Sequence, residues 1–193
     1  MRSFKGVALV LLAAAAALPF AVGEDANVEL SGERQGARMD VYKIRPGSGV
    51  GPVQLGMSRD DAKRAMGTTG HKVESFDRWQ SSPPVLAMQE NSFQVYFDGS
   101  DRVEAIELMG PSSDGQSFGD EPPFAAHYGD VDVFRTRASE LADVVSRDAD
   151  PDKEAEDHGV AFTFPTIGIS LWREGTEDTP FFETVSVFSS KRS

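Results

Sequence analysis

The sequence predicts an α+β fold of two tandem copies of a small unit, each with one or two short helices packed on one face of an antiparallel sheet of about four strands. The first observation is an internal repeat: residues 85–99 align with residues 161–175 at a constant offset, which places Tyr96 on Trp172. Both copies alternate apolar and polar residues, as half-buried strands do. The repeat is longer than a solenoid unit and occurs twice, so two copies of one compact unit are expected.

The N-terminal end has the composition of a secretory signal. Arg2 and Lys5 precede an almost wholly apolar run, and Ala21 and Gly23 place small residues at the −3 and −1 positions of a cleavage site. We therefore expect residues 1–23 to be a signal peptide and the protein to be secreted or periplasmic. An uncleaved membrane anchor is the alternative, because the apolar run is near the short end of what spans a bilayer.

The composition limits the classes of partner that the protein is expected to bind. Residues 24–40 are polar and lack periodicity, which predicts a flexible leader. The chain has no cysteine, so we expect neither a lipoprotein anchor nor disulfides. Its net charge of −12 argues against nucleic acid or an anionic membrane surface as a partner. The same charge favours solubility and could steer the protein to a basic partner.

The first unit is expected over residues 41–110. It begins with a strand at 41–44 and a loop rich in Gly and Pro, followed by a helix that Ser58 caps together with Asp61. Gly67 is expected to end this helix in the left-handed conformation. The expected strands cover 71–76, 85–88, 93–97 and 103–109, and a hairpin turn at 98–101 uses its glycine.

The second unit is expected over residues 124–193, after a linker at 111–123 rich in Pro, Gly and Ser. It begins with a strand at 131–134 and a helix capped by Thr136. The apolar stripe of that helix consists of Leu141, Ala142, Val144 and Val145. The expected strands cover 160–164, 167–172 and 181–188.

Strand alternation separates two faces, because successive side chains point to opposite sides of a sheet. One face is large and apolar and is expected to bury the helices: Leu86, Met88, Phe93, Val95, Phe97, Ile106, Leu108, Phe162, Phe164, Ile169, Leu171, Val185 and Val187. The other face is small and polar except for Tyr96 and Trp172, which occupy the same position in the two copies. Amphipathic aromatics on an open face are good binding anchors, so we expect Tyr96, Trp172, Gln94 and Glu107 to bind a partner. Coverage of these aromatics by the leader or by the other unit is the alternative. Trp79, in a loop with two prolines, is a further candidate anchor, or else folds back over the core.

Catalytic and metal-binding patterns are missing. His71, His127 and His158 form no zinc motif and are expected to be solvated surface side chains. The acidic stretch 148–158 lacks the glycine and glutamate of an EF-hand loop, so a solvated loop is expected there and a looser calcium site is the alternative. No nucleotide-binding glycine motif and no activated serine motif occurs. We therefore expect no enzyme activity, no cofactor and no metal.

The segment GPVQLGMSRDDAKRAMG (residues 51–67) resembles the opening of the small α+β domain shared by SmpA/OmlA (BamE-type) outer-membrane assembly lipoproteins and β-lactamase inhibitory proteins. In that pattern a strand ending in LGMS leads into a short helix, and antiparallel strands follow. Tandem copies resemble the β-lactamase inhibitory proteins, in which a sheet face carrying aromatics binds the target enzyme. The chain lacks the cysteine of the first group and the disulfides of the second. The resemblance therefore implies a binding fold and names no target.

These observations favour an exported, non-enzymatic, acidic module, expected to be monomeric, that binds another protein through the polar sheet face. An inhibitor or immunity-type role fits, because such proteins need a preformed surface and no chemistry. A structural or assembly factor of the cell envelope is the first alternative. A hydrolase with an unrecognised site is the second.

Overall fold

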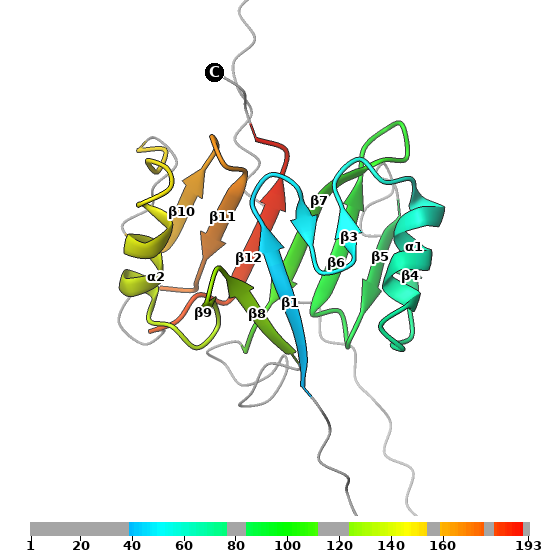
Figure 1. Cartoon of the computed structure of the whole chain (residues 1–193), viewed down its shortest axis with the longest axis horizontal. Helices are drawn as coiled ribbons and strands as arrows, with labels where there is room; N and C mark the ends of the chain where they lie inside the picture. Colours follow the sequence, from blue (N-terminus) through cyan, green and yellow to red (C-terminus); the bar gives the residue numbers. More distant parts are fainter. Residues whose placement is uncertain (1–38, 77–83, 112–123, 154–158, 176–179, 191–193) are drawn as a thin grey trace, which may run out of the picture. The chain divides into compact units, whose positions relative to one another are not determined.

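Two β-sheets and two short helices carry the fold in the computed structural model (Figure 1). The structure describes residues 39–76, 84–111, 124–153, 159–175 and 180–190. Residues 39–193 belong to one compact unit. The expected signal peptide, nearly all of the leader and nearly all of the linker lie outside the described residues.

The larger sheet has seven strands and is antiparallel throughout. In spatial order they are β10 (Ala161–Phe164), β11 (Ile169–Trp172), β12 (Thr184–Phe188), β7 (Val103–Met109), β6 (Phe93–Phe97), β5 (Val85–Met88) and β4 (Glu74–Phe76). The pairing of β7 with β12 joins strands from the two halves of the chain into one sheet.

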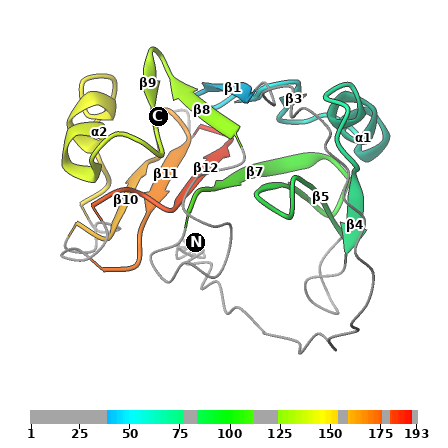
Figure 2. The same ribbon diagram turned by 90° about the horizontal axis from the view of Figure 1, so that it is seen from below.

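The smaller sheet has five strands and lies over one face of the larger sheet (Figure 2). In spatial order they are β3 (Val53–Gln54), β2 (Gly49–Val50), β1 (Asp40–Arg45), β8 (Phe124–Tyr128) and β9 (Val131–Asp132). The central strand β1 is antiparallel to β2 and parallel to β8, and this is the one parallel pairing among the described strands. The sequence pattern predicted β1 but did not predict β2 or β8. Both are short or rich in small residues, so they carry little alternation.

The core lies between the two sheets. Tyr42 of β1 stands edge-on to Phe93 of β6 and to Phe124 of β8, each at 5.2 Å between ring centroids. All but one of the residues predicted for the apolar face are buried, and the exception, Phe162, is partly buried against the core. The sequence predicted that helices would cover this face. The smaller sheet covers most of this apolar face instead. The two helices lie at the two ends of the larger sheet (Figure 1).

Helix α1 (Arg59–Gly67) begins as predicted. The Asp61 backbone N–H donates to Ser58 Oγ at 3.2 Å, and the Ser58 hydroxyl donates to Asp61 Oδ2 at 2.6 Å. The prediction for its end is wrong, because Gly67 is still helical and the C-cap Thr68 has a right-handed φ of −68°. The left-handed residue is Gly70, with φ +83°.

Helix α2 (Ala138–Val145) starts one residue later than predicted. Its N-cap is Arg137, which makes no side-chain capping bond, so the prediction of Thr136 as the cap is wrong. The reason is a turn after β9, in which the Thr136 N–H donates to the Asp132 carbonyl at 3.0 Å. Thr136 is therefore the last residue of that turn. The predicted apolar stripe is confirmed, with Leu141, Ala142 and Val145 buried and Val144 partly buried.

The hairpin between β6 and β7 differs from its prediction as well. Gly99 does not have a positive φ, and the left-handed residue is Asp101, with φ +60°. Asp98 Oδ1 accepts hydrogen bonds from the N–H groups of Ser100 at 2.8 Å and Arg102 at 3.0 Å. An Asp side chain that mimics a backbone turn in this way replaces the expected glycine.

Candidate functional site

A row of polar side chains crosses the outer face of the seven-stranded sheet. Gln94 lies opposite Glu107, Glu107 opposite Ser186, Ser186 opposite Ser170, and Ser170 opposite Thr163. We call these five residues the polar row. Because they alternate with buried residues such as Phe93 and Val95, they point away from the smaller sheet. The Thr163 and Ser170 hydroxyls are hydrogen-bonded at 3.2 Å.

Tyr96 and Trp172 lie on the same outer face, on opposite sides of the polar row. Tyr96 is opposite Ala105, which is in turn opposite Phe188. Trp172 is opposite Thr184, which is in turn opposite Met109. Three strand spacings across and four residues along separate the two aromatics, which gives roughly 20 Å between them. The predicted aromatics therefore share a face but do not touch.

Hydrogen bonds hold Tyr96 in place. Its hydroxyl donates to Gln94 Oε1 at 2.6 Å and lies 3.5 Å from Glu107 Oε1. Gln94 Nε2 donates to the Asn91 carbonyl at 3.0 Å. Gln94 and Glu107 are each only 7% exposed, whereas Tyr96 is half-buried. Of the predicted binding residues, these two therefore position Tyr96 more than they offer surface themselves.

Trp172 is the more exposed of the two aromatics. Its side chain is 39% exposed, although it belongs to the short strand β11, and its carbonyl accepts the Glu183 N–H at 2.8 Å. Strands β10 and β12 pair with β11 on its two sides, so the backbone that carries the indole is fixed. Trp79, the remaining predicted anchor, lies outside the described residues.

A second polar cluster lies at the start of β1 and was not predicted. His71 Nε2 contacts Asp40 Oδ2, and Gln89 Nε2 donates to the same oxygen at 3.1 Å. The Tyr42 hydroxyl donates to Gln89 Oε1 at 3.2 Å. Burial, with the nearby Asp40 carboxylate, raises the pKa of Tyr42 to about 12. The His71 side chain is 37% exposed, so it remains partly solvated, and its pairing with a carboxylate was not predicted.

The turn between β5 and β6 connects the polar cluster at the start of β1 with the hydrogen bonds around Tyr96. Gln89, Glu90 and Asn91 all have left-handed backbones, with φ values of +52°, +56° and +70°. Three consecutive non-glycine residues in this region are uncommon, since each costs free energy. The turn directs Gln89 to the cluster at β1 and the Asn91 carbonyl to Gln94 on the outer face. Without a glycine in the sequence of this turn, nothing signalled its conformation.

Tyr42 and Tyr128 are both buried, and both of their hydroxyls donate hydrogen bonds. A tyrosine with a raised pKa stays protonated at neutral pH, so Tyr42 is a hydrogen-bond donor and a poor base. The Tyr128 hydroxyl donates to Asp148, and burial together with this carboxylate raises the pKa of Tyr128 as well. In the part of the chain that the structure describes, no group of three or more His, Asp or Glu side chains is placed to hold a metal ion.

Comparisons with protein families, with curated proteins and with solved structures find no match for this chain. Neither helix of the described residues is long and apolar enough to cross a membrane.

Proposed function

We propose that this chain is an exported, non-enzymatic binding module that binds another protein through the outer face of the seven-stranded sheet. The observation that carries the proposal is the placement of Tyr96 and Trp172 on either side of the polar row. Rigid aromatics with a polar tip supply much of the binding energy in protein interfaces. An inhibitor or immunity-type protein would use such a preformed face.

The proposal includes a tandem repeat, and the strand registers support it. Leu86 lies opposite Val95, and in the other half Phe162 lies opposite Leu171. These two pairs occupy equivalent positions under the sequence alignment that relates the halves.

Outside the segment 85–99, residues 104–109 align with residues 183–188 at an offset of 79. Val95 opposite Ile106 corresponds to Leu171 opposite Val185. Residues 51–58 align with residues 129–136, which places Ser58 on Thr136, so the bridge from Ser58 to Arg102 and the bridge from Arg137 to Phe181 differ by one residue.

Strand β1 lies between the β2–β3 hairpin and the β8–β9 hairpin, at the centre of the smaller sheet. Two copies related in this way place Tyr96 and Trp172 at equivalent points of one continuous face. A partner with two contact patches, or one long segment, would fit such a face.

The test is capture of partners from the native secretome with three immobilised proteins. These are the wild type, a Tyr96→Ala/Trp172→Ala double variant, and a Lys63→Ala control whose side chain is exposed on helix α1. Partners recovered by the wild type and the control should be lost with the double variant. Thermal unfolding must show that the double variant is folded. Equal recovery by all three would remove the outer face from consideration.

The mass of the exported protein distinguishes a free binding module from an envelope assembly factor. Loss of residues 1–23 would favour a free binding module, and a retained N-terminal segment would favour an anchored factor.

A further inference from the structure

The outer face of the five-stranded sheet has a composition unlike that of the chain as a whole. Along β1, Tyr42 and Ile44 are buried, whereas Val41, Lys43 and Arg45 are exposed. Val41 is 54% exposed, more than any other large apolar side chain in the described part of the chain. Val41, Lys43 and Arg45 therefore form a stripe of one apolar and two basic side chains on the outer face of this central strand.

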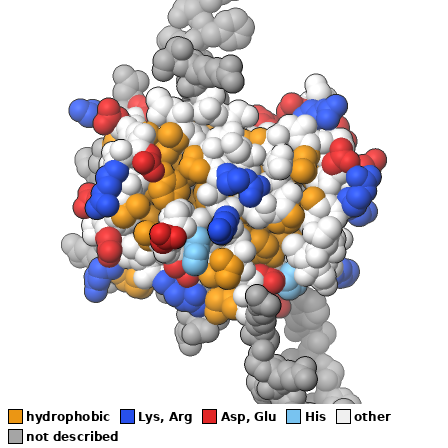
Figure 3. Space-filling model, viewed as in Figure 1, with side chains coloured by type: hydrophobic (Ala, Val, Ile, Leu, Met, Phe, Trp, Pro, Cys, Tyr) orange, Lys and Arg blue, Asp and Glu red, His pale blue; other side chains and the backbone are white. Residues whose placement is uncertain are grey.

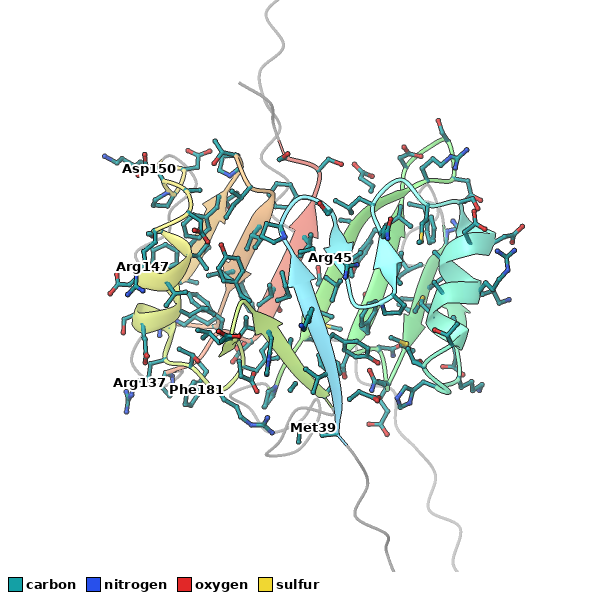
Figure 4. All side chains as sticks on the ribbon, viewed as in Figure 1. Met39, Arg45, Arg137, Arg147, Asp150 and Phe181 are labelled. Atoms are coloured by element: carbon teal, nitrogen blue, oxygen red, sulfur yellow. The ribbon has the colours of Figure 1, made fainter. Side chains whose placement is uncertain are left out.

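The charge of this face is positive in a chain whose net charge is −12. Lys43 and Arg45 point outward from β1, and Arg135 follows β9. The one carboxylate that these strands direct outward, Asp132, is bound to Arg135 at 3.0 Å. Figure 3 shows basic side chains at the middle of this face and acidic ones mainly toward its margins, and Figure 4 places Arg45 over β1.

The two cations of β1 are available and well placed. Lys43 makes no hydrogen bond or salt bridge with another described residue, and His127 lies opposite it on β8. One nitrogen of Arg45 donates to the Gly51 carbonyl at 2.8 Å, which holds the guanidinium while leaving its other donors free for a ligand. A fixed guanidinium loses less entropy when it binds a carboxylate.

The spacing of these side chains suits an extended polypeptide. Residues two apart on a strand are roughly 7 Å apart and point the same way. Carboxylates at alternate positions of an extended segment have the same spacing, so two of them can meet Lys43 and Arg45 together. The next position along the stripe is Val41, which calls for an apolar side chain.

We propose that the outer face of the five-stranded sheet binds an extended acidic segment of a partner protein. Two carboxylates of that segment, two residues apart, contact Lys43 and Arg45, and an apolar side chain packs on Val41. An anionic membrane is a poorer fit, because a flat bilayer would also bring the acidic margins of this face close to anionic headgroups, whereas a single segment along β1 meets its basic middle. The surface is distinct from the one that carries Tyr96 and Trp172, which lies on the other sheet.

The probe is a fluorescein-labelled peptide, Gly-Glu-Thr-Glu-Thr-Val-Gly, with binding followed by fluorescence anisotropy at low salt. A peptide with Gln in place of Glu is its control. The Lys43→Glu/Arg45→Glu variant should bind the acidic peptide at least about tenfold more weakly than the wild type. The Gln peptide should lose a similar factor with the wild type.

A charge-matched variant, Lys63→Glu/Lys153→Glu, reverses two exposed lysines that belong to none of the strands of this sheet. It should bind the peptide within about twofold of the wild type, as should the Tyr96→Ala/Trp172→Ala variant. The proposal is overturned if the wild type does not bind the peptide, or if both charge-reversal variants weaken binding equally. Tighter binding to phosphatidylglycerol vesicles or to inorganic polyphosphate than to the peptide would also overturn it.

Discussion

Glu107 of β7 lies directly opposite Ser186 of β12, at the point where strands from the two halves of the chain meet. The pairs on either side, Leu108 with Val185 and Ile106 with Val187, place four buried residues across this junction. The two halves therefore share one sheet and one core. We expect them to unfold in a single transition, because neither half can bury its apolar face without the other.

The centre of that core sets the first prediction. Phe93 is fully buried and contacts Tyr42 across the two sheets. Phe93→Ala should lower the free energy of unfolding by about 3–5 kcal/mol, because it leaves a cavity in a region with little room to collapse. Urea unfolding measures the change. Val41→Ala, at an exposed position, should stay within about 0.5 kcal/mol of the wild type.

The two helix N-termini differ in their caps, which predicts different losses of stability for two alanine variants. Ser58→Ala removes the side-chain acceptor of the Asp61 N–H and should cost about 1 kcal/mol of unfolding free energy. Thr136→Ala should change stability by less than about 0.5 kcal/mol, because Thr136 is not the cap of α2. Equal losses for the two variants, measured by urea unfolding, would contradict the assignment of Arg137 as the N-cap.

The left-handed turn between β5 and β6 predicts that one substitution by glycine is stabilising. Glu90 is exposed with φ +56°, a conformation that glycine adopts without steric cost. Glu90→Gly should therefore stabilise the protein by about 0.5–1 kcal/mol, against the usual direction of a substitution by glycine. Thermal and urea unfolding measure the sign. A destabilised variant would show that Glu90 is not held in this conformation in solution.

Gly168 and Gly99 differ in the space around a Cβ atom, which predicts different costs for the two alanine substitutions. A Cβ on Gly168 would lie 2.0 Å from the Phe188 carbonyl oxygen, and its φ is +69°. Gly168→Ala should cost more than about 2 kcal/mol, because the backbone of β12 would have to move. A Cβ on Gly99 would meet no atom within 4 Å, so Gly99→Ala should be nearly neutral. Similar unfolding midpoints for the two variants would argue against the close approach of residue 168 to β12.

The ionisation of Tyr42 predicts how the stability depends on pH above neutrality. Its pKa is raised to about 12 in the folded protein, whereas an unfolded tyrosine ionises near pH 10. Below pH 10 both states keep the proton and the stability is fully present. Between pH 10 and 12 the unfolded chain releases a proton that the folded chain keeps, so the free energy of unfolding falls as the pH rises.

Tyr42→Phe should flatten this part of the stability curve. The loss removed is at most about 2–3 kcal/mol across the interval, and Tyr128 contributes in the same direction in both proteins. Absorbance at 295 nm follows tyrosinate formation directly, and the variant should lack one ionisation step that the wild type shows above pH 11. Identical pH dependence of unfolding in the two proteins would place the Tyr42 ring outside the core.

Local features of the structure were readable from the sequence. The strands at 85–88, 93–97 and 103–109 and the start of α1 at Ser58 are confirmed, because side-chain alternation and capping involve residues close in the chain. The same alternation placed Tyr96 and Trp172 on the polar face. The α+β class followed from these elements together.

Contacts between distant parts of the chain were decided only by the tertiary structure. The insertion of β1 between β2 and β8, and the meeting of Asp40, His71 and Gln89, join segments with no pattern relating them. Burial of Gln94 and Glu107 on a face that the sequence marks as polar depends on the side chains of neighbouring strands. Periodicity gives the direction in which a side chain points, because it is a property of one strand. Packing gives what the side chain meets there, because it is a property of the whole fold.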